Sequence, residues 1–191
     1  RNFSLLVAFA AAAAAAAASA QEPFVKVGPE TVYDAGIRCA VPFFAVADFD
    51  RDGRQDFVLG NTPLSSYAPG GKPGALMVWM AQPDGSFSEQ AAQLFSGPVT
   101  AAIMFAQVRV GDVNGDGLLD IFVPDGGLDI GDNGGSTPKL ALGTPTGFVD
   151  ASARFAGMPT TRAHNGVLAD IDRNGTLDAF VGGTNITTRA S

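Results

Sequence analysis

Residues 47–60 read ADFDRDGRQDFVLG, and the same pattern returns at residues 111–124 (GDVNGDGLLDIFVP) and 169–182 (ADIDRNGTLDAFVG). Each copy has the form Asp-x-Asp/Asn-x-Asp/Asn-Gly-x-x-Asp and runs directly into apolar residues. The opening aspartates are Asp48, Asp112 and Asp170, which lie 64 and 58 residues apart. A repeat of this length is long for a solenoid and suits a propeller blade of four strands. We therefore predict an all-β fold, a β-propeller of four-stranded antiparallel blades.

Short apolar runs around each copy predict the strands of these blades. First strands are expected at 41–47, 106–110 and 166–168, second strands at 57–59, 121–123 and 179–181, and third strands at 75–80 and 139–142. A turn after each third strand leads to a fourth strand that opens with Phe87 or Phe148. β-Branched and aromatic runs bounded by Gly and Pro favour such strands. The expected blades cover about residues 41–100, 101–160 and, in part, 161–191, and residues 21–40 are a lead-in strand or linker.

This count of about two and a half blades leaves the ring open, because propellers have about four to eight blades. Open strand edges invite association with other chains. We expect the natural protein to continue beyond Ser191. The alternative is closure of the ring by self-association.

The oxygen-bearing side chains in each copy have the spacing of a calcium site. Calcium takes about six to eight oxygen ligands at about 2.3–2.6 Å. Alternate residues of a tight loop turn inward, and the glycine at position 6 permits the bend that brings in the carbonyl of position 7 and the carboxylate of position 9. We name residues 48–56, 112–120 and 170–178 loops one, two and three. Their expected side-chain ligands are Asp48, Asp50, Asp52 and Asp56, then Asp112, Asn114, Asp116 and Asp120, then Asp170, Asp172, Asn174 and Asp178. The expected carbonyl ligands are those of Arg54, Leu118 and Thr176, and the bends lie at Gly53, Gly117 and Gly175.

Electrostatics also favours a cation in these loops. Two like charges about 4 Å apart repel by roughly 4 kcal/mol at an effective dielectric of about 20. The loops hold ten of the 19 acidic residues of the chain. Magnesium fits less well, because it prefers few protein ligands and keeps its waters. Loop one has four carboxylates and the other loops have three each, so we expect loop one to bind calcium most tightly.

An EF-hand begins with a similar loop, but it needs a glutamate at position 12 and a following helix. Position 12 is Leu59, Val123 or Val181, and the residues after position 9 favour a strand. Calcium loops that lead into strands are therefore the better interpretation.

The loops, their flanking strands and the hairpin segments ALMVWMAQPDGSF (75–87) and KLALGTPTGF (139–148) resemble FG-GAP/VCBS repeats. These are the repeats of the integrin α-subunit propeller and of many bacterial exported proteins. The resemblance covers about residues 41–185. It implies a propeller, commonly seven-bladed, with calcium between the first two strands of a blade. Members of this family serve in adhesion, in ligand capture and as accessory domains of carbohydrate-active enzymes, so the resemblance does not imply a single function.

Residues 1–20 have the features of a secretory signal peptide, which predicts a secreted or periplasmic protein. Arg1 precedes an uncharged apolar run from Leu5 to Ala18, and small residues lead to an expected cleavage after Ala20. The run is too short for a transmembrane span. Cys39 is the only cysteine, which excludes an intrachain disulfide, and it lies too far from the cleavage point for a lipid anchor. After removal of residues 1–20 the net charge is −8, from 11 basic and 19 acidic residues, and such a surface disfavours nucleic acid.

We expect a non-catalytic module in which structural calcium supports recognition of an extracellular protein or glycan. The alternatives are an accessory propeller of a longer carbohydrate-active enzyme, such as a lyase or hydrolase, and a purely structural scaffold. His164, the only histidine, is expected to be structural rather than catalytic. The Gly-rich segments 61–74 and 125–138 either carry ligand contacts or serve as solvated connectors. Their candidate contact residues are Tyr67, Asp125, Asp129 and Asp132.

Overall fold

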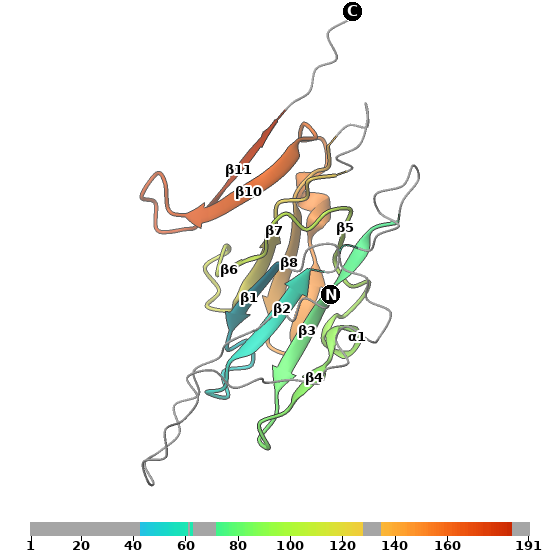
Figure 1. Ribbon diagram of the computed structural model, residues 1–191. Helices are drawn as coiled ribbons and strands as arrows, with labels where there is room; N and C mark the ends of the chain where they lie inside the picture. The colour runs from blue at the N-terminus through green and yellow to red at the C-terminus, as the bar shows by residue number, and fades with distance from the viewer. Residues whose placement is uncertain (1–42, 61, 63–71, 128–134, 185–191) are drawn as a thin grey trace, which may run out of the picture.

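The computed structural model describes residues 43–60, 62, 72–127 and 135–184, which form three antiparallel sheets in chain order (Figure 1). We name the sheets blade one, blade two and blade three. The expected signal peptide, the lead-in segment 21–40, Cys39, Tyr67, Asp129 and Asp132 lie outside the described residues.

Blades one and two have four strands in simple sequential order, and blade three has two. Blade one contains β1 (Phe43–Ala47), β2 (Asp56–Gly60), β3 (Gly74–Ala81) and β4 (Phe87–Glu89), and the short β5 (Ala101–Ala102) also pairs with β3. Blade two contains β6 (Arg109–Gly111), β7 (Asp120–Val123), β8 (Lys139–Thr144) and β9 (Gly147–Asp150). Blade three contains β10 (Arg162–Ala169) and β11 (Asp178–Thr184). This arrangement confirms the prediction of an all-β chain built from antiparallel propeller blades.

The same strand register closes each of the three loops. The residue before position 1 pairs with the aspartate at position 9, in the pairs Ala47 with Asp56, Gly111 with Asp120 and Ala169 with Asp178. A tight antiparallel turn of fixed length therefore carries positions 1 to 8 in every blade.

Two of the predicted first strands have the wrong bounds. β6 begins at Arg109 rather than at residue 106, because the preceding residues bond elsewhere: Phe105 forms an isolated bridge with Asp125, and the Gln107 side chain accepts a hydrogen bond from Gly166 N at 3.0 Å. β10 begins at Arg162 rather than at residue 166, and a bulge after Ala163 interrupts its pairing.

Two short helical turns were not predicted, and they occupy equivalent places in the repeat. The helix α1 (Ala91–Leu94) follows the fourth strand of blade one, and the 3-10 helix η3 (Ser152–Phe155) follows the fourth strand of blade two. Among the described residues, no helix has both the length and the apolar character needed to cross a bilayer.

The hydrophobic core lies between successive blades, as expected for stacked propeller blades. Val58 and Val78 of blade one pack in one cluster with Ile121 and Val123 of blade two. Phe122, which points to the other side of β7, belongs to a second cluster that includes Leu168 and Val181 of blade three. β7 is thus buried on both faces, which explains its continuous apolar sequence.

Candidate cation-binding loops

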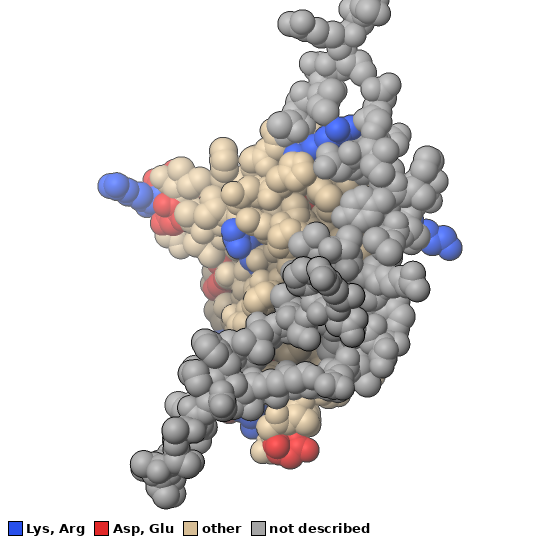
Figure 2. Space-filling view, viewed as in Figure 1, with Lys and Arg blue, Asp and Glu red and all other residues tan. Residues whose placement is uncertain are grey.

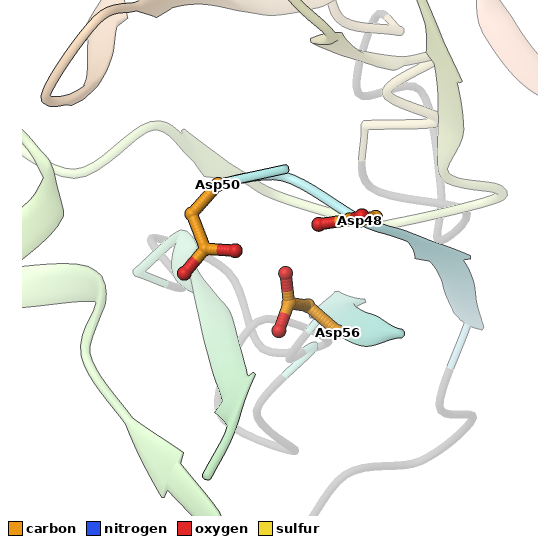
Figure 3. A group of neighbouring side chains, drawn as sticks. All are labelled: Asp48, Asp50 and Asp56. Atoms are coloured by element: carbon orange, nitrogen blue, oxygen red, sulfur yellow. The ribbon is translucent and has the colours of Figure 1, made fainter. Parts of the chain in front are cut away.

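Three carboxylates converge at one centre in loop one. Asp48, Asp50 and Asp56 each offer an oxygen, and these oxygens lie within 4.8 Å of one another (Figure 3). The first two residues follow β1 and the third opens β2, so the hairpin brings positions 1, 3 and 9 together. Carboxylates gathered this closely repel one another, and a divalent cation between them would remove that cost.

Loop three repeats this arrangement with Asp170, Asp172 and Asp178, whose oxygens also lie within 4.8 Å of one another. In Figure 2 acidic side chains gather at the tip of the β10–β11 hairpin, where this loop lies. Loop two has Asp112, Asn114 and Asp120 at the same positions, so one of its three candidate oxygens comes from an amide.

A repeated set of backbone hydrogen bonds shapes all three loops. Position 1 accepts bonds from the N–H groups of positions 5 and 6, position 3 from position 5, position 5 from position 7, and position 9 from position 2. In loop one these bonds join Asp48 to Asp52 N (3.1 Å) and Gly53 N (2.9 Å), Asp50 to Asp52 N (3.2 Å), Asp52 to Arg54 N (2.8 Å) and Asp56 to Phe49 N (2.9 Å). Loops two and three contain every one of these bonds. The candidate ligands therefore also hold the shape of the turn.

Two positions of each loop have left-handed backbone conformation. At position 6, the glycines Gly53, Gly117 and Gly175 have φ angles of 87°, 82° and 88°, which confirms the predicted bend. At position 4, Arg51, Gly115 and Arg173 have φ angles of 61°, 75° and 63°. This second bend was not predicted from the sequence, although Gly115 was a signal for it.

The aspartate at position 9 ties its loop to the third strand of the blade. Asp56 accepts a hydrogen bond from Ala81 N (2.8 Å), and Asp120 accepts one from Gly143 N (2.7 Å). Both side chains are fully buried. Burial raises the pKa of both carboxyl groups, the nearby loop aspartates raise it further, and the backbone hydrogen bonds oppose the change. A cation in the loop would stabilise the charged form of these buried groups.

The segment that contains loops one and two matches a known repeat. Residues 48–123 fit the family described as FG-GAP-like repeat. This segment is an FG-GAP-like repeat region. The chain is also 37% identical over 79 residues to integrin alpha-3 of Mus musculus and, to the same degree, to integrin alpha-3 of Cricetulus griseus. The aligned part is 41% of this chain and only 7% of each integrin, so the chain spans a small part of these relatives.

The side chain at position 5 has a partner in each loop, and in loop one of this FG-GAP-like region Asp52 is not a member of the three-carboxylate group. Asp52 forms an ion pair with the Arg54 guanidinium. Asp116 accepts a hydrogen bond from the Asn114 side-chain amide at 2.9 Å. In loop three, Asn174 accepts a bond from the Thr176 hydroxyl at 2.5 Å. The ligand role of position 5 and of the carbonyls at position 7 stays a prediction.

Loop two holds less negative charge than loop one. Its first aspartate, Asp112, accepts several hydrogen bonds from backbone N–H groups. Desolvation acts to raise the pKa of Asp112, but hydrogen bonds from the N–H groups of Gly117, Gly115 and Asp116 outweigh it and lower the pKa below its usual value. Asp112 is therefore ionised at neutral pH and is available to a cation.

Loops one and two of the FG-GAP-like region touch each other. The Arg51 guanidinium, at position 4 of loop one, donates a hydrogen bond to the Gly117 carbonyl of loop two. That carbonyl belongs to the peptide group just before Leu118, whose own carbonyl is an expected ligand. This contact depends on how the blades stack, so the loop pattern gave no sign of it.

The remaining candidates lie away from these loops. His164 is exposed on β10. Asp125 is fully buried, accepts hydrogen bonds from Ile103 N (3.1 Å) and Met104 N (2.9 Å), and lies 3.4 Å from Lys139 Nζ. Asp125 thus fastens the segment before β6 to the end of β7, and a ligand contact by this residue, one of the two alternatives for segment 125–138, stays a prediction.

Proposed function

We propose that this chain is an exported, calcium-stabilised propeller module that recognises an extracellular protein or glycan. The observation that carries the proposal is the convergence of the first, third and ninth aspartates in loops one and three. The identity to integrin alpha-3 supports recognition rather than catalysis as the role of the module.

Calcium fits these loops better than other common cations. The donors are carboxylate and amide oxygens, with further backbone carbonyls in reach of a bend, which is the ligand type that calcium and magnesium prefer. Magnesium keeps several of its waters, so a loop that offers four or five oxygens suits calcium. In each loop, positions 1, 3 and 9 would hold the ion, and positions 5 and 7 would complete its shell after the position-5 side chain rotates inward.

The role of the ion is structural, since the loop itself supplies most of the coordination shell. A cation that binds the folded chain alone stabilises it by about 2.7 kcal/mol per site at a free concentration of about one hundred times Kd. Calcium would therefore hold the β1–β2, β6–β7 and β10–β11 turns in one conformation and keep the blade edges in place for a ligand.

Thermal unfolding with calcium, with magnesium and with EDTA tests the calcium part of the proposal. Calcium should raise Tm strongly, magnesium should raise it less, and EDTA should reverse the effect. The double variant Asp50→Asn/Asp172→Asn is the matched control, because it removes one carboxylate from each three-carboxylate group and keeps the side-chain shape. A Tm that does not change with calcium contradicts the proposal, and an equal response of the control would show that the charge at position 3 does not contribute to it.

Recognition and export need separate measurements. The calcium-loaded chain should bind members of a glycan or extracellular-protein array, and complete absence of binding would favour a structural scaffold.

When the chain is produced with residues 1–20 in an exporting host, the mature product should begin at Gln21. A product that stays inside the cell and still carries residues 1–20 would contradict the export part of the proposal.

A further inference from the structure

Asparagine directly precedes glycine in two of the three loops. Asn114 and Gly115 are positions 3 and 4 of loop two, and Asn174 and Gly175 are positions 5 and 6 of loop three. All four residues are exposed. Asparagine is a thermolabile residue, because the backbone nitrogen of the next residue can attack its side-chain amide carbon, and a glycine there has no Cβ to obstruct that approach. Both pairs are therefore open to deamidation, the conversion of asparagine to an acidic residue.

In loop two, neighbouring groups fit each part of this reaction. The attacking group is Gly115 N, whose N–H donates to Asp112 Oδ1 at 2.7 Å, within reach for transfer of its proton. The attacked group is the Asn114 side-chain carbonyl, whose oxygen accepts a hydrogen bond from Asp116 N at 3.0 Å. A donor at that oxygen stabilises the negative charge that develops during the attack. The leaving nitrogen, Asn114 Nδ2, donates to Asp116 Oδ2 at 2.9 Å.

Loop three repeats the arrangement around Asn174. Gly175 N donates to Asp170 Oδ2 at 2.9 Å. Asn174 Oδ1 accepts bonds from Thr176 N at 2.8 Å and from the Thr176 hydroxyl at 2.5 Å. Asn174 Nδ2 donates to Asp172 Oδ2 at 3.0 Å. In both loops, the aspartate at position 1 therefore contacts the attacking nitrogen, and N–H or O–H donors contact the carbonyl oxygen of the asparagine.

We propose that Asn114 and Asn174 are self-modification sites, at which the loop itself promotes deamidation. The glycine nitrogen forms a bond to the asparagine Cγ, and its proton passes through the aspartate at position 1 to the leaving nitrogen, which departs as ammonia. The product is a cyclic imide. Water then opens the imide at one of its two carbonyls and gives aspartate or isoaspartate. The proposal concerns a modification of the chain and does not depend on its binding of calcium or of a ligand.

Loop one shows that a carboxylate fits at both positions. Asp50 at position 3 and Asp52 at position 5 accept the same backbone bonds as the two asparagines, from Asp52 N at 3.2 Å and from Arg54 N at 2.8 Å. Conversion of Asn114 to aspartate would give loop two carboxylates at positions 1, 3 and 9, as in loop one. Conversion to isoaspartate would insert the side-chain methylene into the backbone and disrupt the turn.

Peptide mapping by mass spectrometry, during incubation of the folded chain in EDTA at neutral pH, tests the proposal. Asn165 is the internal comparison, because it also precedes a glycine but lies in β10, where Gly166 N donates to the Gln107 side-chain amide oxygen at 3.0 Å and not to a carboxylate. Asn114 and Asn174 should convert at least about tenfold faster than Asn165. In urea, which removes the loops, the three pairs should convert at a common rate. Equal rates in the folded chain overturn the proposal.

Two variants test the assigned roles in loop two, with Asn174 as the unaltered reference in the same chain. Gly115→Arg introduces the residue that loop one has at position 4, and a Cβ at this site meets no atom within 4 Å. It should suppress conversion of Asn114 alone. Asp112→Asn keeps an oxygen that can accept the bond from Gly115 N but cannot take its proton, so it should also slow Asn114 alone. An unchanged rate in Asp112→Asn overturns the promotion of the reaction by the loop.

Calcium should slow both conversions, because an ion in the loop would engage the oxygens of the aspartate at position 1 and of the asparagine. This step rests on the proposed calcium binding. Fast conversion in EDTA that calcium leaves unchanged would contradict calcium binding by these loops and would still support self-modification. The two proposals therefore fail separately.

Discussion

Asp56 and Asp50 face the same centre but support the fold to different degrees. Asp56 is buried and accepts hydrogen bonds through both carboxylate oxygens, from Phe49 N and from Ala81 N. Asp50 is exposed and accepts a bond from Asp52 N at 3.2 Å. Substitution of the two residues therefore separates the binding of a cation from the support of the loop.

Asp50→Asn should weaken calcium binding without weakening the metal-free fold. The amide oxygen can still accept the bond from Asp52 N, so the free energy of unfolding in EDTA should change by less than about 0.5 kcal/mol. The gain in stability on addition of calcium should shrink, because one charged ligand is lost. Urea unfolding in EDTA and in calcium measures both quantities, and an unchanged calcium gain would show that the charge of Asp50 does not contribute to calcium binding.

Asp56→Ala should destabilise the chain even in EDTA. It leaves two backbone N–H groups without acceptors, and each such buried group costs about 1–3 kcal/mol. Asp178→Ala is the comparison variant, because Asp178 is only half-buried and bonds within its own loop, to Ile171 N and Asp172 N. The same urea unfolding should give a clearly smaller loss for Asp178→Ala; equal losses would contradict the structural role of Asp56.

The sequence predicted the parts of the site that depend on local spacing. An acidic residue at positions 1, 3 and 9 and a glycine at position 6 specify the turn, and the structure brings these positions together in loops one and three. The left-handed bend at position 4 has a sequence signal only in Gly115 of loop two, because at Arg51 and Arg173 the residue type gives no sign of it. The bond from Ala81 N to Asp56 joins residues 25 apart and exists only after the blade has folded.

At the scale of the elements, loop one and loop two form a connected pair. Arg51 reaches across the gap between two blades to the Gly117 carbonyl. Loop two has Gly115 at the position of Arg51, so it has no corresponding side chain to extend toward loop three. The repeat therefore predicts coupling between loops one and two that is absent between loops two and three.

Arg51→Gly should weaken calcium binding in loop two. A hydrogen bond contributes about 0.5–1.5 kcal/mol net, and an exposed one belongs at the lower end, so the affinity should fall by about two- to fivefold. Arg173→Gly makes the same backbone change in loop three and should leave loop two unaffected. Calorimetric titration of calcium measures the affinity of loop two. The titrated chains must keep loops one and two both functional, because the coupling needs both loops. Equal effects of the two substitutions would show that no coupling passes through Arg51.

The charge count of the loops sets their order of affinity. Loop one has aspartate at all four side-chain positions, whereas loops two and three each have one asparagine there. Loop one should therefore bind calcium most tightly, provided that the ion outcompetes Arg54 for Asp52. Variants that keep one functional loop each allow the three affinities to be compared by calorimetry. An equal or lower affinity in the loop-one chain would show that the Arg54 ion pair cancels the extra charge.

The first residue of a strand was predicted most accurately where a loop or turn directly precedes the apolar residues of that strand. β2, β7 and β8 begin within a residue of the predicted starts, because the aspartate pattern or a turn marks their ends. β6 was placed too early because Ala106 and Val108 are as apolar as strand residues, yet they are buried by packing alone. α1 and η3 are single turns, and in neither does the N-cap residue, Gln90 or Ala151, make a side-chain capping hydrogen bond.

At the scale of the whole molecule, the main hydrophobic core of the described residues is shared between blades. The largest apolar cluster joins Val58 and Val78 of blade one to Ile121 and Val123 of blade two, and Phe105 packs into it from the connection between them. Gly60 lies against the Phe105 ring so closely that an added Cβ would approach it to 2.5 Å. Blades that share their buried surface in this way should unfold together.

Ile121→Ala in blade two should therefore lower the stability of blade one. Ile121 is fully buried, and removal of a large aliphatic side chain from such a site costs about 2–5 kcal/mol. Trp79, the only tryptophan, lies on β3 and stacks on Phe57, so its fluorescence reports on blade one alone. The urea midpoint seen by Trp79 should fall together with the midpoint seen by far-UV circular dichroism. Val149→Ala, at an exposed position of blade two, should move neither midpoint. If the Trp79 midpoint stayed in place while the dichroism transition moved, the blades would be independent units, and the shared core would not hold the array together.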